Sequence, residues 1–268
     1  MAALCYETIN RSPFITPGFE AELPAQLRAA AAAGFEYAGI DLPSLEQHLQ
    51  TGASLPEVAE LLARLELPCF ELQPLIVSVD EAYTVGQAER FAEAARALGA
   101  AWVQCGLGGE LGLDMAAAFR RAAEIIGGAG AALALEYLPF APIRGIEETR
   151  AFLAEAGAPG AKIVVDSWHF FHGPDDWAAL EGLALDELAY PQFNDHPEIA
   201  TGDLMQETVQ RRALPGQGVF ELERFVRTLR DKGYAGPVSV EILSAELREH
   251  APEQFAREVF AAASPFWA

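Results

Sequence analysis

The chain repeats one pattern along its length: an Ala/Leu-rich stretch of helical character, then a glycine, then a short apolar run. Glycine is common directly after a helix, and continuous apolar runs are typical of parallel strands covered by helices. The pattern predicts strands at 4–9, 37–42, 68–75, 101–105, 132–137, 162–166, 188–194 and 237–242. It predicts helices near 20–33, 55–66, 80–98, 113–127, 145–157, 174–184, 218–232 and 251–263. Eight such units predict a closed (β/α)8 barrel.

An open doubly wound sheet is the competing fold, but no GxGxxG motif follows the first apolar run. The segment Gly106-Leu-Gly-Gly is too short to indicate a phosphate loop, and we interpret it as a turn. No Pro/Gly/Ser linker or change in composition divides the 268 residues, of which 51% are hydrophobic. We therefore expect one α/β domain over residues 1–268, a TIM barrel with a large core.

The charge and the cysteines narrow the class of protein. A formal charge of −21 argues against binding to nucleic acid and against acidic membrane surfaces, and it is consistent with solubility. No run of about 18 apolar residues and no basic leader indicates a membrane span or a signal peptide. Cys5, Cys69 and Cys105 lie in apolar runs without CxxC spacing, which predicts buried thiols in a reducing cytoplasm.

Four polar residues lie at the ends of apolar runs in the second half of the chain, namely Glu136, Asp166, Gln192 and Glu241. A carboxylate at the end of a buried strand is costly to desolvate unless a cation or hydrogen bonds meet it. Because the strand ends of a barrel meet at one face, we expect these residues to share one divalent metal ion. The alternative is that each is a separate cap or ion-pair partner.

The predicted ligand set also indicates which metal it would prefer. Three carboxylates and an amide form an oxygen-rich shell that suits Mn²⁺ or Mg²⁺, with Co²⁺ also acceptable. Zn²⁺ usually selects more nitrogen or sulfur ligands and ranks lower. Units one to four contribute Glu7, Asn10, Asp41 and Gln73 as candidates for shaping the pocket, and purely structural roles are equally open for them.

Two further residues are candidates for chemistry. His169 follows Asp166 by three residues and could hold a substrate oxygen or move a proton, or could be structural among its aromatic neighbours. Arg212 is expected in the loop after the seventh strand, immediately before the last crossover helix. Its guanidinium could stabilise an enolate or bind a substrate oxygen. The alternative is that it only neutralises nearby acids.

Residues near the seventh strand have weaker indications. His196 lies four residues past Gln192 and directly before a proline, so metal or substrate contact is the less favoured reading. Asp195 is expected to support the site rather than bind an ion, and His172 is expected in a loop. The turn at 215–218 is interpreted as mainly structural. The aromatic stretch 260–267 would pack on the barrel or on a second subunit, so a homodimer stays open.

Several motifs together resemble the xylose-isomerase-like TIM-barrel family of sugar isomerases and epimerases. They are Leu-Glu-Tyr at 135–137, Val-Asp-Ser-Trp-His at 165–169, Arg-Arg-Ala-Leu-Pro-Gly-Gln-Gly at 211–218 and Val-Ser-Val-Glu at 238–241. The chain is most similar to 2-keto-myo-inositol isomerases and 3-dehydroshikimate dehydratases. The resemblance implies that Glu136, Asp166, Gln192 and Glu241 bind the metal. It also implies that His169 and Arg212 contact substrate.

The chain departs from the family pattern at two places. Most sugar epimerases of the family carry His where this chain has Gln192, and the dehydratases resemble it in carrying Gln. Their Gln-Pro-Phe-Arg motif is Gln73-Pro74-Leu75-Ile76 here, without the Arg, which counts against dehydroshikimate as substrate. Endonuclease IV shares the fold but uses many His residues, and five His with a charge of −21 fit it poorly.

The resulting hypothesis is a metal-dependent isomerase or epimerase of a ketose, keto-cyclitol or related polyhydroxy ketone. Glu136 or Glu241 would remove a proton beside the carbonyl, and Arg212 would stabilise the enediolate. The alternative is a lyase, in which the same enolate expels a β-hydroxyl with His169 as the acid. A third reading is a non-catalytic sugar-binding barrel, which Gln192 permits because an amide binds metal more weakly than imidazole.

Overall fold

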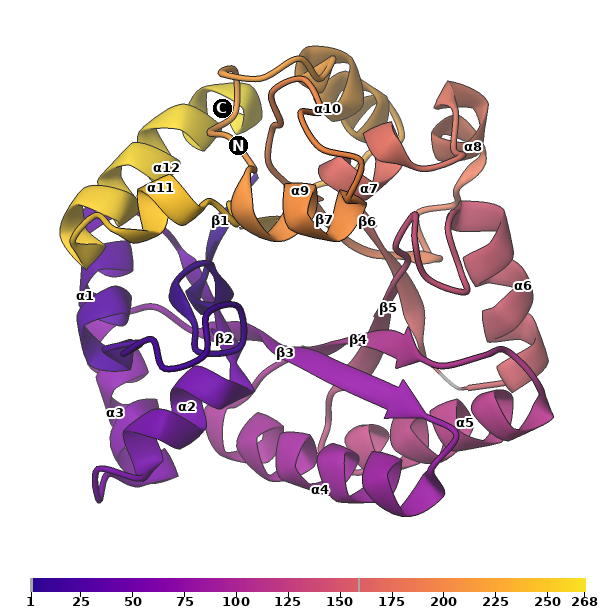
Figure 1. Ribbon diagram of the computed structural model, residues 1–268. Helices are drawn as coiled ribbons and strands as arrows, with labels where there is room; N and C mark the ends of the chain where they lie inside the picture. The colour runs from indigo at the N-terminus through magenta and orange to yellow at the C-terminus, as the bar shows by residue number, and fades with distance from the viewer. Residues whose placement is uncertain (1, 159) are drawn as a thin grey trace.

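The computed structural model describes residues 2–158 and 160–268, and its centre is a closed barrel of eight parallel strands (Figure 1). Each strand pairs with its neighbours in chain order, and β8 pairs with β1 to close the sheet. The predicted fold is therefore confirmed. The strands are β1 (Leu4–Glu7), β2 (Tyr37–Asp41), β3 (Cys69–Ser78), β4 (Trp102–Gly108), β5 (Ala132–Glu136), β6 (Lys162–Asp166), β7 (Leu188–Phe193) and β8 (Val238–Val240).

Helices surround this barrel in the order that the repeated pattern predicts. The expected helices appear as α1 (Leu23–Ala33), α3 (Leu55–Leu65), α4 (Glu81–Leu98), α5 (Leu113–Gly127), α6 (Ile146–Ala156), α8 (Trp177–Gly182), α10 (Leu222–Asp231) and α12 (Pro252–Trp267). Additional short helices are η1 (Thr8–Arg11), α2 (Leu42–Leu49), α7 (Ser167–His172), α9 (Leu204–Gln210) and α11 (Ala245–Arg248). Apart from α2, each of these has at most seven residues, too few for an apolar period to show in sequence.

The structure corrects two local predictions and adds one helix to a third region. Residues Gly106–Gly108 are not a turn, because β4 continues through them and pairs with the long strand β3. His172 is not in a loop but is the last residue of α7. Arg212 lies in the loop that leads into the crossover helix α10, as expected, and the unexpected element of this connection is α9, which ends just before Arg212.

The glycines that follow the predicted helices adopt positive φ angles in the structure. Gly34, Gly99 and Gly157 follow α1, α4 and α6 with φ angles of 108°, 72° and 59°. This left-handed region strains side chains with a Cβ atom, so glycine is the favoured residue there. The helices therefore stop at defined positions, and the chain turns directly into the next strand.

Two apolar clusters stabilise the barrel. The larger one lies between the strands and the helices. A smaller one, made by Cys5, Phe70, Ala134, Val164 and Tyr190, lies inside the barrel, since Phe70 on β3 and Tyr190 on β7 meet with ring centroids 5.1 Å apart. All three cysteines are free and buried, as predicted.

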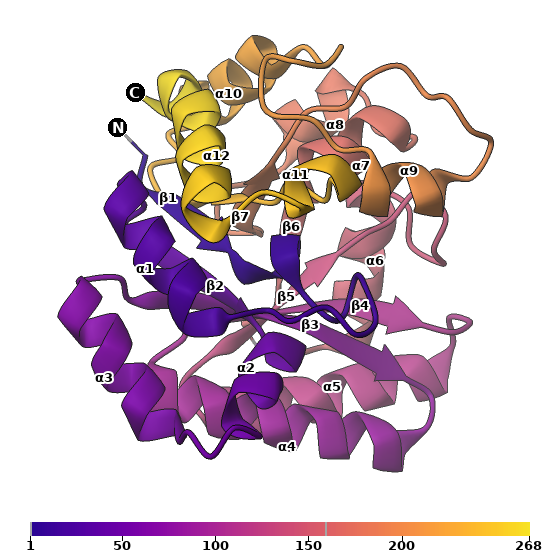
Figure 2. The same ribbon diagram turned by 60° about the vertical axis from the view of Figure 1, so that its left-hand side comes forward.

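The aromatic stretch at the end of the chain packs on the barrel. Trp267 is buried against Phe193 of β7, and Phe260 packs edge-on against Phe35 beyond α1. Helix α12 lies beside α1, and the two ends of the chain are adjacent (Figures 1 and 2). In the described part of the chain, no helix is both long and apolar enough to cross a membrane.

Candidate functional site

The predicted strand-end residues come together at the end of the barrel where β5 to β8 finish. Ligand atoms of Glu136, Asp166 and His169 all lie within 4.8 Å of one another. Glu241 is 2.8 Å from the Arg212 Nη1 atom, which is also 2.8 Å from Asp166. The Gln192 amide lies 3.5 Å from the Glu241 Oε1 atom. Residues separated by about a hundred positions in sequence thus form one polar cluster, because the barrel brings their strand ends to the same face.

Glu136 is held between two side chains of different kinds. The amide of Gln104 on β4 donates to Glu136 Oε2, and His169 Nε2 lies 3.2 Å from Oε1. Oε1 has no other polar partner among the described residues. One oxygen of Glu136 is therefore fixed by hydrogen bonding, while the other faces His169 and remains available to a cation or a proton.

Asp166 is the most heavily hydrogen-bonded carboxylate of the cluster. Its Oδ1 accepts from the backbone N–H groups of Trp168 and His169, so it also caps α7. The Asn194 amide contacts both oxygens, and Arg212 Nη1 donates to Oδ2 at 2.8 Å. Burial opposes ionisation of Asp166, but Arg212 and then His169 hold its pKa below the ordinary value. Asp166 is consequently ionised, and its position is fixed.

Glu241 differs from Asp166 although both contact the same guanidinium. Burial raises its pKa well above the ordinary value; Arg212 lowers it, and Glu136 raises it further. In the absence of a further cation, the cluster therefore holds more negative charge than Arg212 alone can neutralise. The buried Gln192 Oε1 atom has no hydrogen-bond partner among the described residues.

Hydrogen bonds to Thr208 hold the Arg212 guanidinium between Asp166 and Glu241. Its Nε donates to the Thr208 carbonyl at 3.0 Å and its Nη2 to the Thr208 hydroxyl at 2.8 Å. Thr208 belongs to α9, so this unpredicted helix orients the guanidinium. Burial lowers the pKa of Arg212, but Asp166 and Glu241 outweigh it and raise the pKa, so the charge is permanent.

The other histidines of this region form a separate cluster. His196 Nδ1 lies 3.3 Å from His172 Nε2, and His196 Nε2 lies 3.1 Å from Glu207. Burial and then His196 lower the pKa of His172 to about 4, and burial lowers that of His196. Glu207 also binds Arg211 at 2.6 Å. His196 thus contacts Glu207 of α9 and not the carboxylates of Glu136, Asp166 or Glu241.

Asp195 organises the turn at 215–218. Its Oδ2 accepts from the N–H groups of Gly216 and Gly218, and its Oδ1 accepts from those of His196 and Phe220. A Cβ atom at Gly218 would overlap the Asp195 carboxylate. Both carboxylate oxygens are therefore committed to the backbone, which leaves Asp195 in the supporting role that the sequence predicts.

The candidates from units one to four fall into different roles. Asn10 of η1 holds the end of β8, since its amide donates to the Val240 carbonyl and its oxygen accepts from the Ile242 N–H. Asp41 caps α2 and accepts from the Thr8 hydroxyl. Both are structural. Gln73 lines the cavity beside the cluster, and its amide donates to Glu7 inside the barrel.

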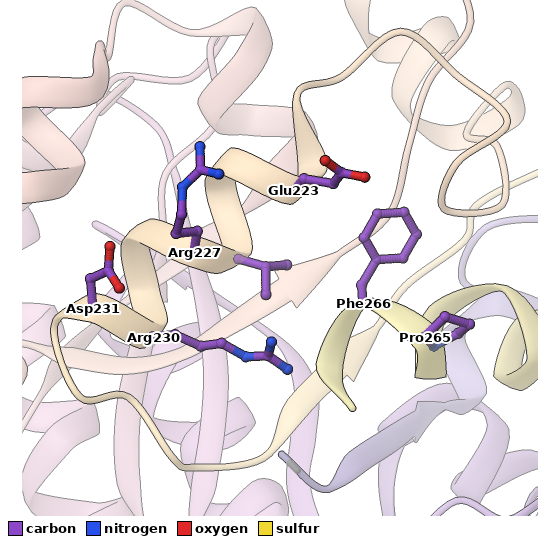
Figure 3. A pocket seen from close by; sticks show the side chains of 7 residues that line it. Glu223, Arg227, Arg230, Asp231, Pro265 and Phe266 are labelled. Atoms are coloured by element: carbon purple, nitrogen blue, oxygen red, sulfur yellow. The ribbon is translucent and has the colours of Figure 1, made fainter.

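The cavity next to the cluster has a volume of about 240 Å³ and is lined by Glu136, His169, Arg212 and Glu241 together with many apolar side chains. A larger hollow lies outside the barrel between α10 and α12, where Arg227, Arg230 and Phe266 are found (Figure 3). The residues that line this hollow all belong to α10 and α12 and none to a strand end, and Glu223 and Asp231 accompany the two arginines there. The smaller cavity is therefore the candidate active site.

Several contributing residues were not singled out from the sequence. Asn194 holds both Asp166 oxygens, and Gln104 holds Glu136. Glu71 lies inside the barrel near Glu7 and accepts from Tyr190 and Ser239. A polar residue within an otherwise apolar run is the signal common to Gln104 and Glu71, because such a side chain must point into the barrel and find a partner.

Comparison with known proteins agrees with the barrel fold. The sequence pattern described as "Xylose isomerase-like TIM barrel" matches residues 27–262. A 3-dehydroshikimate dehydratase from Pseudomonas putida is 29% identical over 35% of this chain and 15% of that protein. An inosose isomerase from Halalkalibacterium halodurans is 25% identical over 47% of this chain and 44% of that protein. The matched segments thus span less than half of either relative.

Solved structures share the fold over the whole length. The IolI protein, solved with a bound zinc atom, superimposes with a TM-score of 0.85 over 99% of this chain and 98% of its own, at 18% identity. At this identity the likeness establishes the fold alone. The match of the family pattern to most of the chain goes further. The chain belongs to the xylose isomerase-like TIM barrel family.

Proposed function

We propose that the protein is a divalent-metal-dependent isomerase or epimerase of a ketose, a keto-cyclitol or a related polyhydroxy ketone. The observation that carries the proposal is the convergence of Glu136, Asp166 and His169 within 4.8 Å, with Glu241 and Gln192 alongside, next to a small cavity. Membership in the family and the inosose isomerase relative give independent support.

The cluster fits a divalent cation. The guanidinium of Arg212 pairs with two of the three carboxylates, Asp166 and Glu241. Glu136 Oε1 has only His169 as a polar neighbour, and the buried Gln192 Oε1 has no hydrogen-bond donor among the described residues. Glu136, Asp166, Gln192 and Glu241 would hold the ion, which would polarise the substrate carbonyl. Oxygen donors favour Mn²⁺ or Mg²⁺, and the nearby His169 nitrogen makes Zn²⁺ more competitive than an oxygen-only set does.

The proton transfer is assigned to Glu136 or Glu241. One carboxylate takes the proton from the carbon beside the carbonyl, and the electron pair delocalises into an enediolate. The raised pKa of Glu241, caused first by burial, stabilises its acid form once the proton has arrived. Return of the proton to the opposite face gives the epimer, and return to the neighbouring carbon gives the isomer.

His169 and Arg212 support this transfer. His169 Nε2 contacts Glu136 and lines the cavity, so it can orient the carboxylate and donate to a substrate oxygen. Arg212 is buried, permanently charged and also lines the cavity, so it faces the negative charge that develops on the enediolate. These roles require no movement of the barrel strands.

The test is exchange of substrate hydrogen with ²H₂O. Purified protein is stripped with EDTA, reloaded with Mn²⁺, Mg²⁺, Co²⁺ or Zn²⁺, and incubated with a panel of ketohexoses, ketopentoses and inososes. We expect metal-dependent uptake of deuterium beside the carbonyl of at least one compound. Absence of exchange with every compound and every metal, while a metal still raises the thermal stability, would refute the isomerase mechanism.

A metal-dependent dehydratase is the second candidate. The P. putida relative is a 3-dehydroshikimate dehydratase. The motif resemblance described above also groups this chain with such dehydratases through Gln192. The same enolate would then expel the β-hydroxyl as water, with the proton supplied by His169. Growth of a conjugated-enone absorbance on incubation with an inosose would favour elimination over isomerisation.

A further inference from the structure

We infer that Gln73 and Gln104 determine substrate specificity by presenting their amide oxygens as hydrogen-bond acceptors to the hydroxyl groups of an uncharged substrate. This inference rests on the proposed function, since it names the substrate class of the same cavity. It concerns two residues of the neighbouring strands β3 and β4, both of which line the cavity beside Glu136, His169 and Arg212.

The orientation of both amides is fixed by carboxylates. Gln73 Nε2 donates to Glu7 Oε2, and Gln104 Nε2 donates to Glu136 Oε2. Exchanging the nitrogen and the oxygen of either amide would set a carbonyl oxygen against a carboxylate oxygen, which is repulsive. The amide oxygens must therefore point away from Glu7 and Glu136.

Both amide oxygens are buried and lack a donor. Gln73 is 0% exposed and Gln104 is 3% exposed, and neither Oε1 atom has a hydrogen-bond partner within the described residues. Buried carbonyl groups are almost always hydrogen-bonded in native proteins. Two unpartnered acceptors on residues that line one cavity point to a ligand that supplies two donors, which hydroxyl groups do.

In its described part, the rest of the cavity wall offers no unpaired cationic side chain to a charged substrate. Arg212 is the single Lys or Arg among the described residues that line it, and Asp166 and Glu241 already neutralise this guanidinium. A phosphate or carboxylate group away from the proposed ion would therefore find no free Lys or Arg to pair with on these residues. The remaining wall is apolar, with residues that include Ile9, Phe14, Ile76, Leu138 and Phe140.

The cavity has hydrogen-bond acceptors on one side and apolar side chains on the rest, and this arrangement indicates the shape of its ligand. One edge carries hydroxyls that meet Gln73 and Gln104, and the C–H face lies on the apolar wall. At about 240 Å³ the cavity is smaller than the roughly 300–1,000 Å³ typical of drug-sized ligands. A free monosaccharide or cyclitol ketone meets these requirements, whereas a sugar phosphate does not.

Calorimetric titration of the Mn²⁺-loaded protein tests the inference. The probes are 2-keto-myo-inositol, D-fructose, D-fructose 6-phosphate and 3-dehydroshikimate. We expect at least one neutral ketone to bind, and Gln73→Met to weaken its binding about five- to tenfold while the response to Mn²⁺ stays unchanged. Gln73→Met is chosen because Gln73, unlike Gln104, does not contact a proposed metal ligand.

Gln26→Met is the matched control. Gln26 is equally buried, but its oxygen accepts from the Tyr6 hydroxyl and its nitrogen donates to two carbonyls outside the cavity. It should lower stability without weakening ketone binding. Tighter binding of either anionic probe, unchanged binding in Gln73→Met, or binding of none of the neutral ketones would overturn the inference. Ketone binding without deuterium exchange would overturn the proposed reaction and leave the recognition intact.

Discussion

Replacement of Arg212 by methionine tests the electrostatic organisation of the site. Methionine keeps much of the length of the side chain but removes the charge that lies 2.8 Å from both Asp166 and Glu241. Because all three groups are buried, the substitution leaves two carboxylates without their counter-charge. Loss of one partner from a buried ion pair destabilises a protein by about 3–5 kcal/mol.

The expected change in melting temperature follows from the size of the chain. At about 2.1 cal/mol/K per residue, 268 residues give an unfolding entropy of about 0.56 kcal/mol/K. The metal-free Arg212→Met variant should therefore melt about 5–9 °C below the metal-free wild type. Differential scanning calorimetry in EDTA measures this difference directly.

Addition of metal should act more strongly on the variant than on the wild type. Arg212 and a divalent cation would neutralise the same carboxylates, so removal of Arg212 leaves the ion as their remaining counter-charge. A tenfold gain in Mn²⁺ affinity adds about 1.4 kcal/mol at saturation. The increase in melting temperature on adding Mn²⁺ should thus be about 2–3 °C larger in the variant, although the variant loses turnover.

Arg150→Met is the matched control for this experiment. Arg150 pairs with Glu187 at the surface and is 30% exposed in its side chain, so the substitution should cost at most about 1 kcal/mol. Its response to Mn²⁺ should equal that of the wild type. A response of Arg212→Met that equals or falls below the wild-type response would refute the idea that Arg212 and the ion share their carboxylates.

Three further predictions concern pH, packing and metal choice. Burial opposes ionisation of Glu207, but hydrogen bonds from backbone N–H groups hold its pKa at about 2, below the ordinary 4.5. Its stabilising effect is therefore complete above pH 4.5 and is lost as the pH falls toward 2, and Glu207→Gln should flatten this part of a urea-unfolding profile. Gly39→Ala should destabilise the protein by about 1–3 kcal/mol in urea unfolding, because the new Cβ atom would overlap the Glu7 carboxylate. As a comparison, the new Cβ atom of Gly86→Ala in α4 meets open space, and this variant should be more stable by about 0.5–1 kcal/mol. Gln192→His should raise Zn²⁺ affinity about tenfold or more relative to Mg²⁺ in competition titrations, and an unchanged ratio would place position 192 outside the ion's ligands.

The fold could be predicted because the signals that define it are local and repeated. The glycines after α1, α4 and α6 adopt the left-handed conformation that their position implied, and the apolar runs became parallel strands. Short helices were missed because they depend on capping contacts rather than on an apolar period. Helix α7, for example, begins where Asp166 accepts from two backbone N–H groups.

The site was predictable where chemistry coincides with a strand end. Glu136, Asp166, Gln192 and Glu241 were found on this basis, and their convergence follows from the barrel. The position of Arg212 between Asp166 and Glu241 could not be predicted, because it depends on the contacts of Thr208 in a helix that the sequence pattern did not reveal. Whether these side chains act as proposed remains a prediction.

The buried carboxylates Glu7 and Glu71 inside the barrel lower the stability of the folded protein, so their replacement could raise it. They lie within 4.8 Å of each other, and burial raises the pKa of both, which disfavours folding. Replacing such a polar layer with volume-matched apolar residues is often neutral or stabilising. The same negative potential extends to Glu136 and Glu241, where it favours a cation. An engineered barrel with an apolar layer here should tolerate more heat and hold its metal less tightly, so thermal tolerance and ion retention are traits that cannot be maximised together in this chain.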